Sequence, residues 1–116
     1  MVSVIKRGEI FLVNFEPIKG REQGGIRPAL ILQNDISNTF SLVTIVAAIT
    51  SKIPEKEYPT NVFVPKKESR LDKDSTILLN QIRTIDKTRL IKRLSSLDNF
   101  KMNQVDLAIR ISLGLK

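Results

Sequence analysis

The feature that most restricts the fold is a series of short strand-like runs, interrupted by Gly, Pro and charged residues. Residues 9–15 alternate in polarity, as a half-buried strand does, and residues 42–50 are rich in β-branched side chains. Runs of this length between turn-forming residues are typical of strands. The sequence therefore predicts strands at residues 9–15, 29–33, 42–50, 61–64, 76–85 and 91–94.

A single helical pattern follows these runs near the end of the chain. Asp98 is a suitable N-cap, and Gly114 is placed to end the helix. The apolar residues between them that recur at spacings of three and four are Met102, Val105, Ile109 and Leu113. We predict a mainly β fold, a strongly bent antiparallel sheet or small barrel with this C-terminal α-helix packed on it.

The segments between the strands carry turn-forming and charged residues. Residues 17–25 form a loop longer than a hairpin needs, and such loops often have a function. Residues 34–41 have turn chemistry, and residues 52–60 form an irregular connector with two prolines. Residues 66–74 are predicted to be a turn or a single helical turn whose charges are solvated. Asp86 can cap a short helical turn that runs to Leu90.

The composition limits both the size and the chemistry of the protein. A chain of 116 residues has the length of one domain, so residues 1–116 are predicted to form one. Cysteine and histidine are absent, which excludes thiolate zinc sites, a Cys nucleophile and an imidazole base. We therefore predict no metal and no cofactor. No apolar run approaches the roughly 20 residues that cross a bilayer, so no membrane contact is expected.

The charge balance points to an anionic partner. Nineteen basic and 12 acidic residues give a formal net charge of +7. A protein with this charge attracts polyanions through counterion release, which favours nucleic acid or another anionic surface.

The stretch at residues 22–28, Glu-Gln-Gly-Gly-Ile-Arg-Pro, is the least generic part of the chain. Gly24 and Gly25 allow the backbone to take positive φ or to approach a ligand closely, while Pro28 favours an extended Arg27. Glu22 and Gln23 place polar atoms beside the cation. Arg27 is thus either a ligand-binding arginine at a glycine hinge or a solvated residue of a surface turn.

Two further groups of polar side chains lie at the ends or in the middle of predicted strands. Thr50 and Ser51 leave two hydroxyls where the strand of residues 42–50 ends, and Asn80 and Gln81 interrupt the apolar residues of 76–85. Threonine also favours strands for packing reasons alone, and Asn80 could simply face solvent.

Five segments and the end of the predicted helix form a recognisable series along the chain. They are KRGE (6–9), EQGGIRP (22–28), QND (33–35), IVAAIT (45–50), QIRTIDK (81–87) and ISLG (111–114). In this order they resemble the MazF/PemK (Kid) endoribonuclease toxins of bacterial toxin–antitoxin pairs, and the resemblance extends over essentially the whole chain.

The resemblance implies an SH3-like small barrel of the CcdB/PemK type that forms a homodimer in the bacterial cytoplasm. It also implies metal-independent and ribosome-independent cleavage of single-stranded RNA at short specific sequences. Arg27 and Thr50 match the two catalytic positions of the family. The expected partner is a MazE-like antitoxin whose acidic C-terminal segment occupies the RNA groove.

The residues are compatible with this chemistry. Attack by the neighbouring 2′-OH needs neither a metal nor a water nucleophile, and it leaves a 2′,3′-cyclic phosphate and a 5′-OH. The guanidinium of Arg27 suits the charge that develops on phosphate oxygens, and Thr50 can position the phosphate or relay a proton. The pKa of arginine is too high for it to be an effective base.

Recognition of the RNA bases would depend on polar groups near the groove. Glu22, Gln23, Asn80 and Gln81 are the candidates, together with Gly24, Gly25 and Ser51 as RNA-binding positions. Asn80 stands where many members of the family have glutamate, and Arg21 replaces a small residue that is common there, so the family's cleavage sequence does not carry over to this chain.

Two alternative functions remain open. The first is a non-catalytic, CcdB-like toxin that binds a protein target such as DNA gyrase, although such a toxin has no need for Arg27 together with Thr50. The second is a plain RNA-binding module, which the low aromatic content of 5% disfavours because stacking platforms use aromatic side chains.

Overall fold

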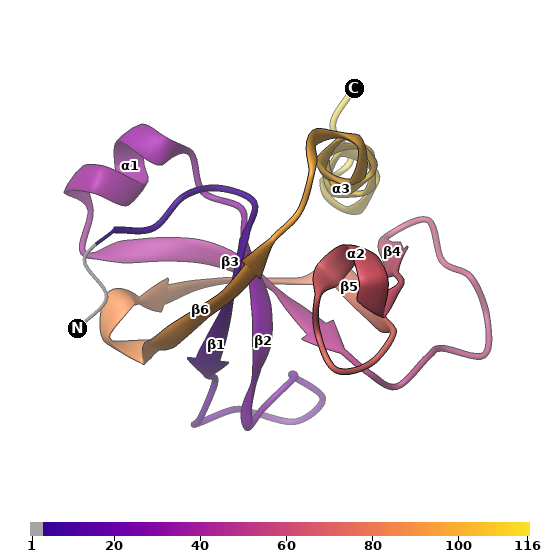
Figure 1. Ribbon diagram of the computed structural model, residues 1–116, viewed down its shortest axis with the longest axis horizontal. Helices are drawn as coiled ribbons and strands as arrows, with labels where there is room; N and C mark the ends of the chain where they lie inside the picture. Colours follow the sequence, from indigo (N-terminus) through magenta and orange to yellow (C-terminus); the bar gives the residue numbers. More distant parts are fainter. Residues whose placement is uncertain (1–3) are drawn as a thin grey trace.

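The computed structural model of the protein describes residues 4–116 and shows one antiparallel sheet of six strands with a long C-terminal helix (Figure 1). The strands follow the order β4-β5-β3-β2-β1-β6, so β4 and β6 lie at the two ends of the sheet. The expected mainly β fold with a C-terminal helix is confirmed. The elements are β1 (Glu9–Asn14), β2 (Ile26–Ile31), α1 (Asp35–Phe40), β3 (Val43–Thr50), β4 (Asn61–Val64), α2 (Lys66–Ser69), β5 (Ser75–Asp86), η1 (Lys87–Arg89), β6 (Leu90–Ser96) and α3 (Asn99–Leu113).

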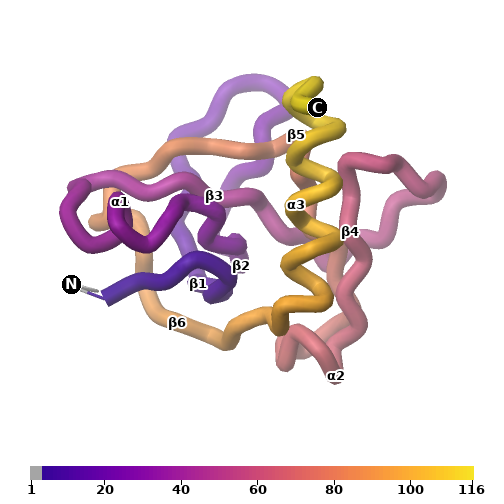
Figure 2. The backbone as a smooth tube through the Cα atoms, turned by 90° about the horizontal axis from the view of Figure 1, so that it is seen from above, coloured from indigo at the N-terminus to yellow at the C-terminus, as the bar shows by residue number. Residues whose placement is uncertain are grey.

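Each face of the bent sheet packs on its own apolar cluster. The alternation along β1 separates them, because Ile10 packs in one cluster while Phe11 and Val13 pack in the other. The cluster that contains Ile10 is covered by α3, which lies beside β4 and β5 (Figure 2). The second cluster lies on the other face and contains Phe11 and Val13 of β1, Ala29 and Ile31 of β2, and Val46 and Ala48 of β3.

The C-terminal helix begins and ends where the sequence predicts. The Asp98 carboxylate accepts a hydrogen bond from the backbone N–H of Lys101, and Gly114 takes the left-handed conformation at φ 69°. Met102 and Val105 are buried as predicted, and Ala108 joins them. The prediction for Leu113 is wrong, because its side chain is 58% exposed in the last turn, beyond the end of the sheet.

The prediction of a turn at residues 34–41 is also wrong, because most of this segment forms the helix α1. Asn34 is its N-cap, with a side chain that accepts a hydrogen bond from Ser37 N at 2.8 Å. Asn38 points inward and is 1% exposed, and its side chain binds Gln33 and Thr44. The turn-forming residues thus serve as a cap and as a buried polar centre.

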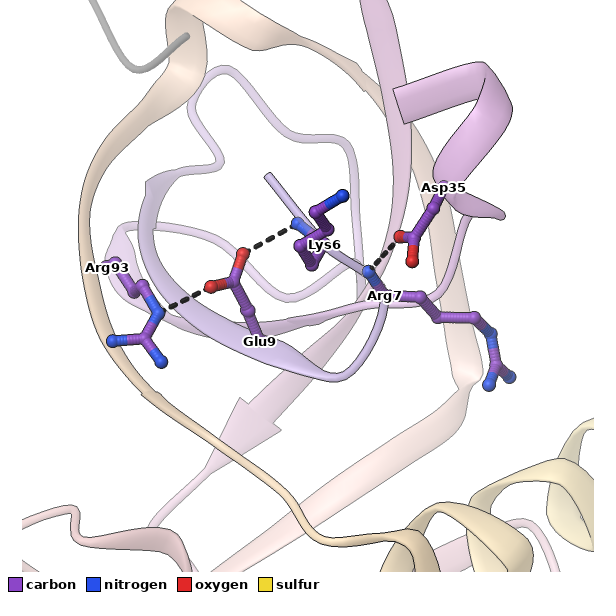
Figure 3. A network of polar contacts seen from close by, with 5 residues as sticks. All are labelled: Lys6, Arg7, Glu9, Asp35 and Arg93. Carbon is purple, nitrogen blue, oxygen red and sulfur yellow. Dashed lines mark hydrogen bonds and ion pairs between the residues drawn. The ribbon is translucent and has the colours of Figure 1, made fainter. Parts of the chain in front are cut away.

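A network of polar contacts holds the segment before β1 in place (Figure 3). The backbone N–H of Arg7 donates to the Asp35 carboxylate at 2.7 Å, which ties this segment to α1. Glu9 accepts from Lys6 N at 2.6 Å and from Arg93 Nε of β6 at 2.5 Å. The sheet, α1 and the N-terminal segment are therefore joined at one corner of the molecule.

This network predicts that stability falls in acid. The hydrogen bond from Arg7 N lowers the pKa of Asp35 below its ordinary value, while slight burial acts in the opposite direction. Since the pKa is lower in the folded chain, the unfolded chain binds more protons, and stability is lost as pH falls below about 4. We expect Asp35→Asn to melt at a lower temperature at neutral pH and to show a shallower decline in acid. Thermal melts across the pH range measure this, and an unchanged acid slope would contradict it.

An irregularity in β5 bends the sheet. Ala47 of β3 pairs with Ile82, but the next residue, Ala48, pairs with Leu78. Leu79, Asn80 and Gln81 therefore lie between two consecutive positions of the β3 register, as in a β-bulge. Beyond this bulge the first part of β5 also pairs with β4.

None of the helices in residues 4–116 is long and apolar enough to cross a membrane.

Candidate active site

A cleft of about 810 Å³ collects residues from five parts of the chain. Its walls come from β1, from the β1–β2 loop with the start of β2, from the end of β3 and the two residues after it, from the α2–β5 loop with the start of β5, and from β6. Four of the residues predicted for the site line this cleft: Gln23, Arg27, Thr50 and Ser51. The structure thus brings Arg27 and Thr50 into one concave site, although they belong to different strands.

Arg27 is the second residue of β2, so it has the extended backbone that is expected before Pro28. Its side chain is half-buried. Its Nε donates to the Gly24 carbonyl at 2.7 Å, and its Nη1 donates to Gln23 Oε1 at 2.6 Å. These two bonds use two of the five N–H groups of the guanidinium. The loop therefore orients the guanidinium while further donors remain for an anion.

The glycines give the loop the shape that orients Arg27. Gly25 has φ +77°, a conformation that side chains disfavour, and its N–H donates to the Glu16 carboxylate at 2.9 Å. A Cβ at Gly24 would lie 2.7 Å from Cδ1 of Ile18. The carbonyl of Gly24 is the acceptor for Arg27, so both glycines act on the arginine through the backbone.

Two arginines fix this loop from outside. Arg83 of β5 donates from Nη1 to the Phe15 carbonyl at 2.9 Å and lies 5.8 Å from the centre of the Phe15 ring. Arg89 of η1 donates to the carbonyl of Asn14 at 3.1 Å and also to that of Glu16. These anchoring roles had no local sequence signal, because the contacts span about 70 residues of sequence.

Thr50 is the last residue of β3, a strand in the middle of the sheet, and it pairs with Thr76 of β5. Its Oγ1 accepts a hydrogen bond from Lys52 N at 3.1 Å. That bond fixes the position of the oxygen and leaves the hydroxyl hydrogen free to donate to a ligand. Ser51 is exposed beside it.

The other predicted positions surround the cleft without lining it. Glu22 is exposed and accepts from Lys19 N at 2.6 Å, which shapes the loop. Gln81 accepts from Gln23 N at 3.4 Å, so the β5 bulge touches the loop that holds Arg27. Asn80 is exposed on the same bulge.

The sequence interpretation missed a group of basic residues in the cleft. Residues 66–74 were expected to form a solvated charged face, but Arg70 and Lys73 line the cleft, as do Lys52 and Lys92. The net charge was a sign of such a group, but its position depends on how the α2–β5 loop folds over β6. Within residues 4–116, no group of three or more Asp or Glu side chains is arranged to hold a metal ion.

Comparisons with known proteins agree with this fold. The family model described as PemK-like, MazF-like toxin of type II toxin–antitoxin systems matches residues 6–113. The chain belongs to this family.

Solved structures show the same fold. A MazF from Deinococcus radiodurans is 28% identical, with a TM-score of 0.83 over 97% of this chain and 98% of that chain. In a MazE–MazF structure from the same organism the identity is 28% and the TM-score 0.76, over 97% and 98% of the two chains. An endoribonuclease in complex with its cognate antitoxin, from a mycobacterial species, is 21% identical, with a TM-score of 0.81 over 97% and 98%.

Proposed function

We propose that this single-domain protein is the toxin of a type II toxin–antitoxin pair and acts as a sequence-specific, metal-independent and ribosome-independent endoribonuclease. It would cleave single-stranded RNA in the bacterial cytoplasm and so stop translation and growth. The observation that carries the proposal is the guanidinium of Arg27, oriented by Gly24 and Gln23, in the same cleft as the Thr50 hydroxyl. A similarity to chains named MazF and endoribonuclease supports it.

The proposed reaction is an internal transfer at phosphorus. The 2′-oxygen of a ribose loses its proton and bonds to the adjacent phosphorus, the bond from phosphorus to the 5′-oxygen breaks, and the leaving 5′-oxygen gains a proton. The products are a 2′,3′-cyclic phosphate and a 5′-OH. Negative charge grows on the nonbridging oxygens, where the free N–H groups of Arg27 would donate charge-assisted hydrogen bonds.

Thr50 has a different role in this scheme. The bond from Lys52 N holds its Oγ1 in place, so its hydrogen can be directed at a phosphate oxygen or at the leaving oxygen. A guanidinium is a very weak base, so the proposed role of Arg27 is to stabilise developing charge, and removal of the 2′-OH proton falls to another group.

Base recognition is proposed for polar groups on the β1–β2 loop and the β5 bulge. Glu22, Gln23, Asn80 and Gln81 offer donors and acceptors, and Gly24 and Gly25 offer close approach to the backbone, with Ser51 at the end of β3. Gln23 also binds Arg27, so the same loop would couple recognition of the RNA to the placement of the guanidinium.

The proposed partners follow from the family. A MazE-like antitoxin would cover the RNA groove with an acidic C-terminal segment, which suits a cleft that carries several cations. We further propose that the toxin acts as a homodimer.

The experiment that tests the proposal is cleavage of a long mixed-sequence RNA by the purified protein in buffer with EDTA. We expect cuts at a short recurring sequence, with 2′,3′-cyclic phosphate and 5′-OH ends identified by end-specific ligation. Intact RNA under these conditions, or cleavage restored only by a divalent metal, would refute the proposal.

Asn80→Glu is expected to change the sequence that is cut more than the rate of cutting. An amide donates and accepts hydrogen bonds, whereas a carboxylate only accepts, so the set of bases that can pair with position 80 changes. Sequencing of the cut ends from wild type and variant measures this change. Identical cleavage maps would show that Asn80 does not contact a base.

A further inference from the structure

The cleft contains more positive charge than the proposed chemistry uses. Its lining includes five cations, Arg27, Lys52, Arg70, Lys73 and Lys92, and one carboxylate, Asp72. The ion pairs within residues 4–116 are Arg7–Asp106, Arg93–Glu9 and Lys101–Glu68, so none of them neutralises a cation of the cleft. We call Arg70, Lys73 and Lys92 the basic wall; they come from the α2–β5 loop and from β6.

We infer that the basic wall is a second binding site for phosphates of the RNA strand, separate from the position of the scissile phosphate beside Arg27 and Thr50. The inference rests on the proposed function, and its residues lie outside β2 and β3, the two strands that carry Arg27 and Thr50. A single strand that passes through the cleft presents one phosphate per nucleotide, and unpaired cations in a concave site attract them in series.

The backbone of Arg70 supports a functional role. Among residues 4–116, Arg70 is the one residue other than glycine with a positive φ, at 62°. This conformation is unfavourable for an arginine and is taken readily by glycine, which commonly ends a helix in this way. Residues held in such conformations gather at functional sites, so a strained arginine that lines the cleft points to a use for its charge.

The loop that carries Arg70 and Lys73 is firmly held. The N–H of Arg70 donates to the Lys66 carbonyl at 2.7 Å, and the Asp74 carboxylate accepts from Lys66 N at 2.9 Å. Between the two cations, Leu71 packs against the core cluster that α3 covers. The two cations are therefore presented from a fixed backbone, which lowers the entropy lost when they bind.

The test uses substitutions that remove charge without disturbing the fold. Arg70→Gly deletes the cation and places at position 70 a residue that takes a positive φ readily. Glycine also makes the unfolded chain more flexible, which lowers stability slightly. The melting temperature of the variant should therefore be close to that of wild type or above it. Lys73→Gln and Lys92→Gln keep most of the side-chain length. Lys67→Gln is the matched control, because Lys67 is an exposed cation of α2 outside the cleft lining.

Binding is measured by fluorescence anisotropy with a short mixed-sequence RNA that carries 2′-O-methyl groups and cannot be cleaved by 2′-OH attack. Each phosphate contact contributes about 0.7 to the slope of log affinity against log salt for a single strand. The triple variant should therefore lower the slope by about 2, and Arg70→Gly alone by about 0.7, while Lys67→Gln leaves it unchanged. An unchanged slope in the triple variant would overturn the inference.

The same proteins, assayed for cleavage of ordinary RNA, separate this inference from the proposed function. If wild type cleaves RNA and the substitutions in the basic wall do not change the salt slope, the second phosphate site is refuted and the proposed endoribonuclease function stands. If the substitutions change the salt slope but wild type does not cleave RNA, the endoribonuclease function is refuted and the basic wall stands as an RNA-binding site. Absence of RNA binding by wild type refutes both.

Discussion

Arg27→Ala is expected to reduce RNA cleavage by at least about 10²- to 10³-fold while the protein stays folded, as is typical when one donor to a developing oxyanion is removed. The side chain lines the cleft and makes its hydrogen bonds to its own loop, at Gly24 and Gln23, so its loss leaves the sheet intact. Initial rates on a labelled RNA in EDTA measure the effect, with circular dichroism to confirm the fold.

Two further variants sharpen this result. Arg27→Lys retains the charge but lacks the fork that binds two acceptors at once, so its activity should also be far below wild type. Arg21→Ala is the matched control, because Arg21 is an exposed arginine of the same loop that does not line the cleft. A fully active Arg27→Ala protein would exclude the proposed mechanism.

The largest expected loss of stability comes from Asn38→Leu. Asn38 Oδ1 accepts from Gln33 Nε2 at 3.1 Å and from the Thr44 hydroxyl at 2.8 Å, and Asn38 Nδ2 donates to the Gln33 carbonyl at 2.8 Å. Thr44 is 0% exposed, so leucine would leave its hydroxyl without a partner away from water. Buried polar groups left unpaired in this way cost about 1–3 kcal/mol each, which predicts a loss of about 2–4 kcal/mol.

Urea denaturation of the variant and of Thr39→Ala measures this loss. Thr39 lies on the exposed side of the same helix, so its variant should lose much less stability. Because α1 contributes no residue to the cleft lining, Asn38→Leu should still cleave RNA at temperatures where it is folded. A loss below about 1 kcal/mol would show that Asn38 is not central to the buried network.

The features that the sequence predicted well depend on local patterns. Alternation at residues 9–15 assigns Ile10 and Phe11 to opposite faces of the strand, and in the structure the two side chains pack in different clusters. Asp98 and Gly114 bound α3 because capping depends on a few adjacent residues. The pairing of Arg27 and Thr50 in one cleft was expected from the family resemblance, and the register of β2 against β3 brings their strands together.

The features that the sequence did not predict depend on contacts between distant segments. The helix α1 is stabilised by Asn38, and one partner of its side chain is the hydroxyl of Thr44, a buried residue of β3. Arg83 and Arg89 contact the β1–β2 loop across the fold. Arg70 and Lys73 looked like part of a solvated charge run, because the sequence does not show that their loop lines the same cleft as Arg27.

The bulge of β5 has a consequence for how such a protein can diversify. Asn80 and Gln81 lie between two consecutive positions of the β3 register, so a change of side chain there alters neither the pairing of Ala47 with Ile82 nor that of Ala48 with Leu78. Mutations at these two positions can therefore accumulate at little cost in folding, and of the two it is Gln81 that binds the loop that orients Arg27, through Gln23 N. Under the base-reading role that we propose for Asn80 and Gln81, related chains can acquire new targets one substitution at a time and keep the same sheet.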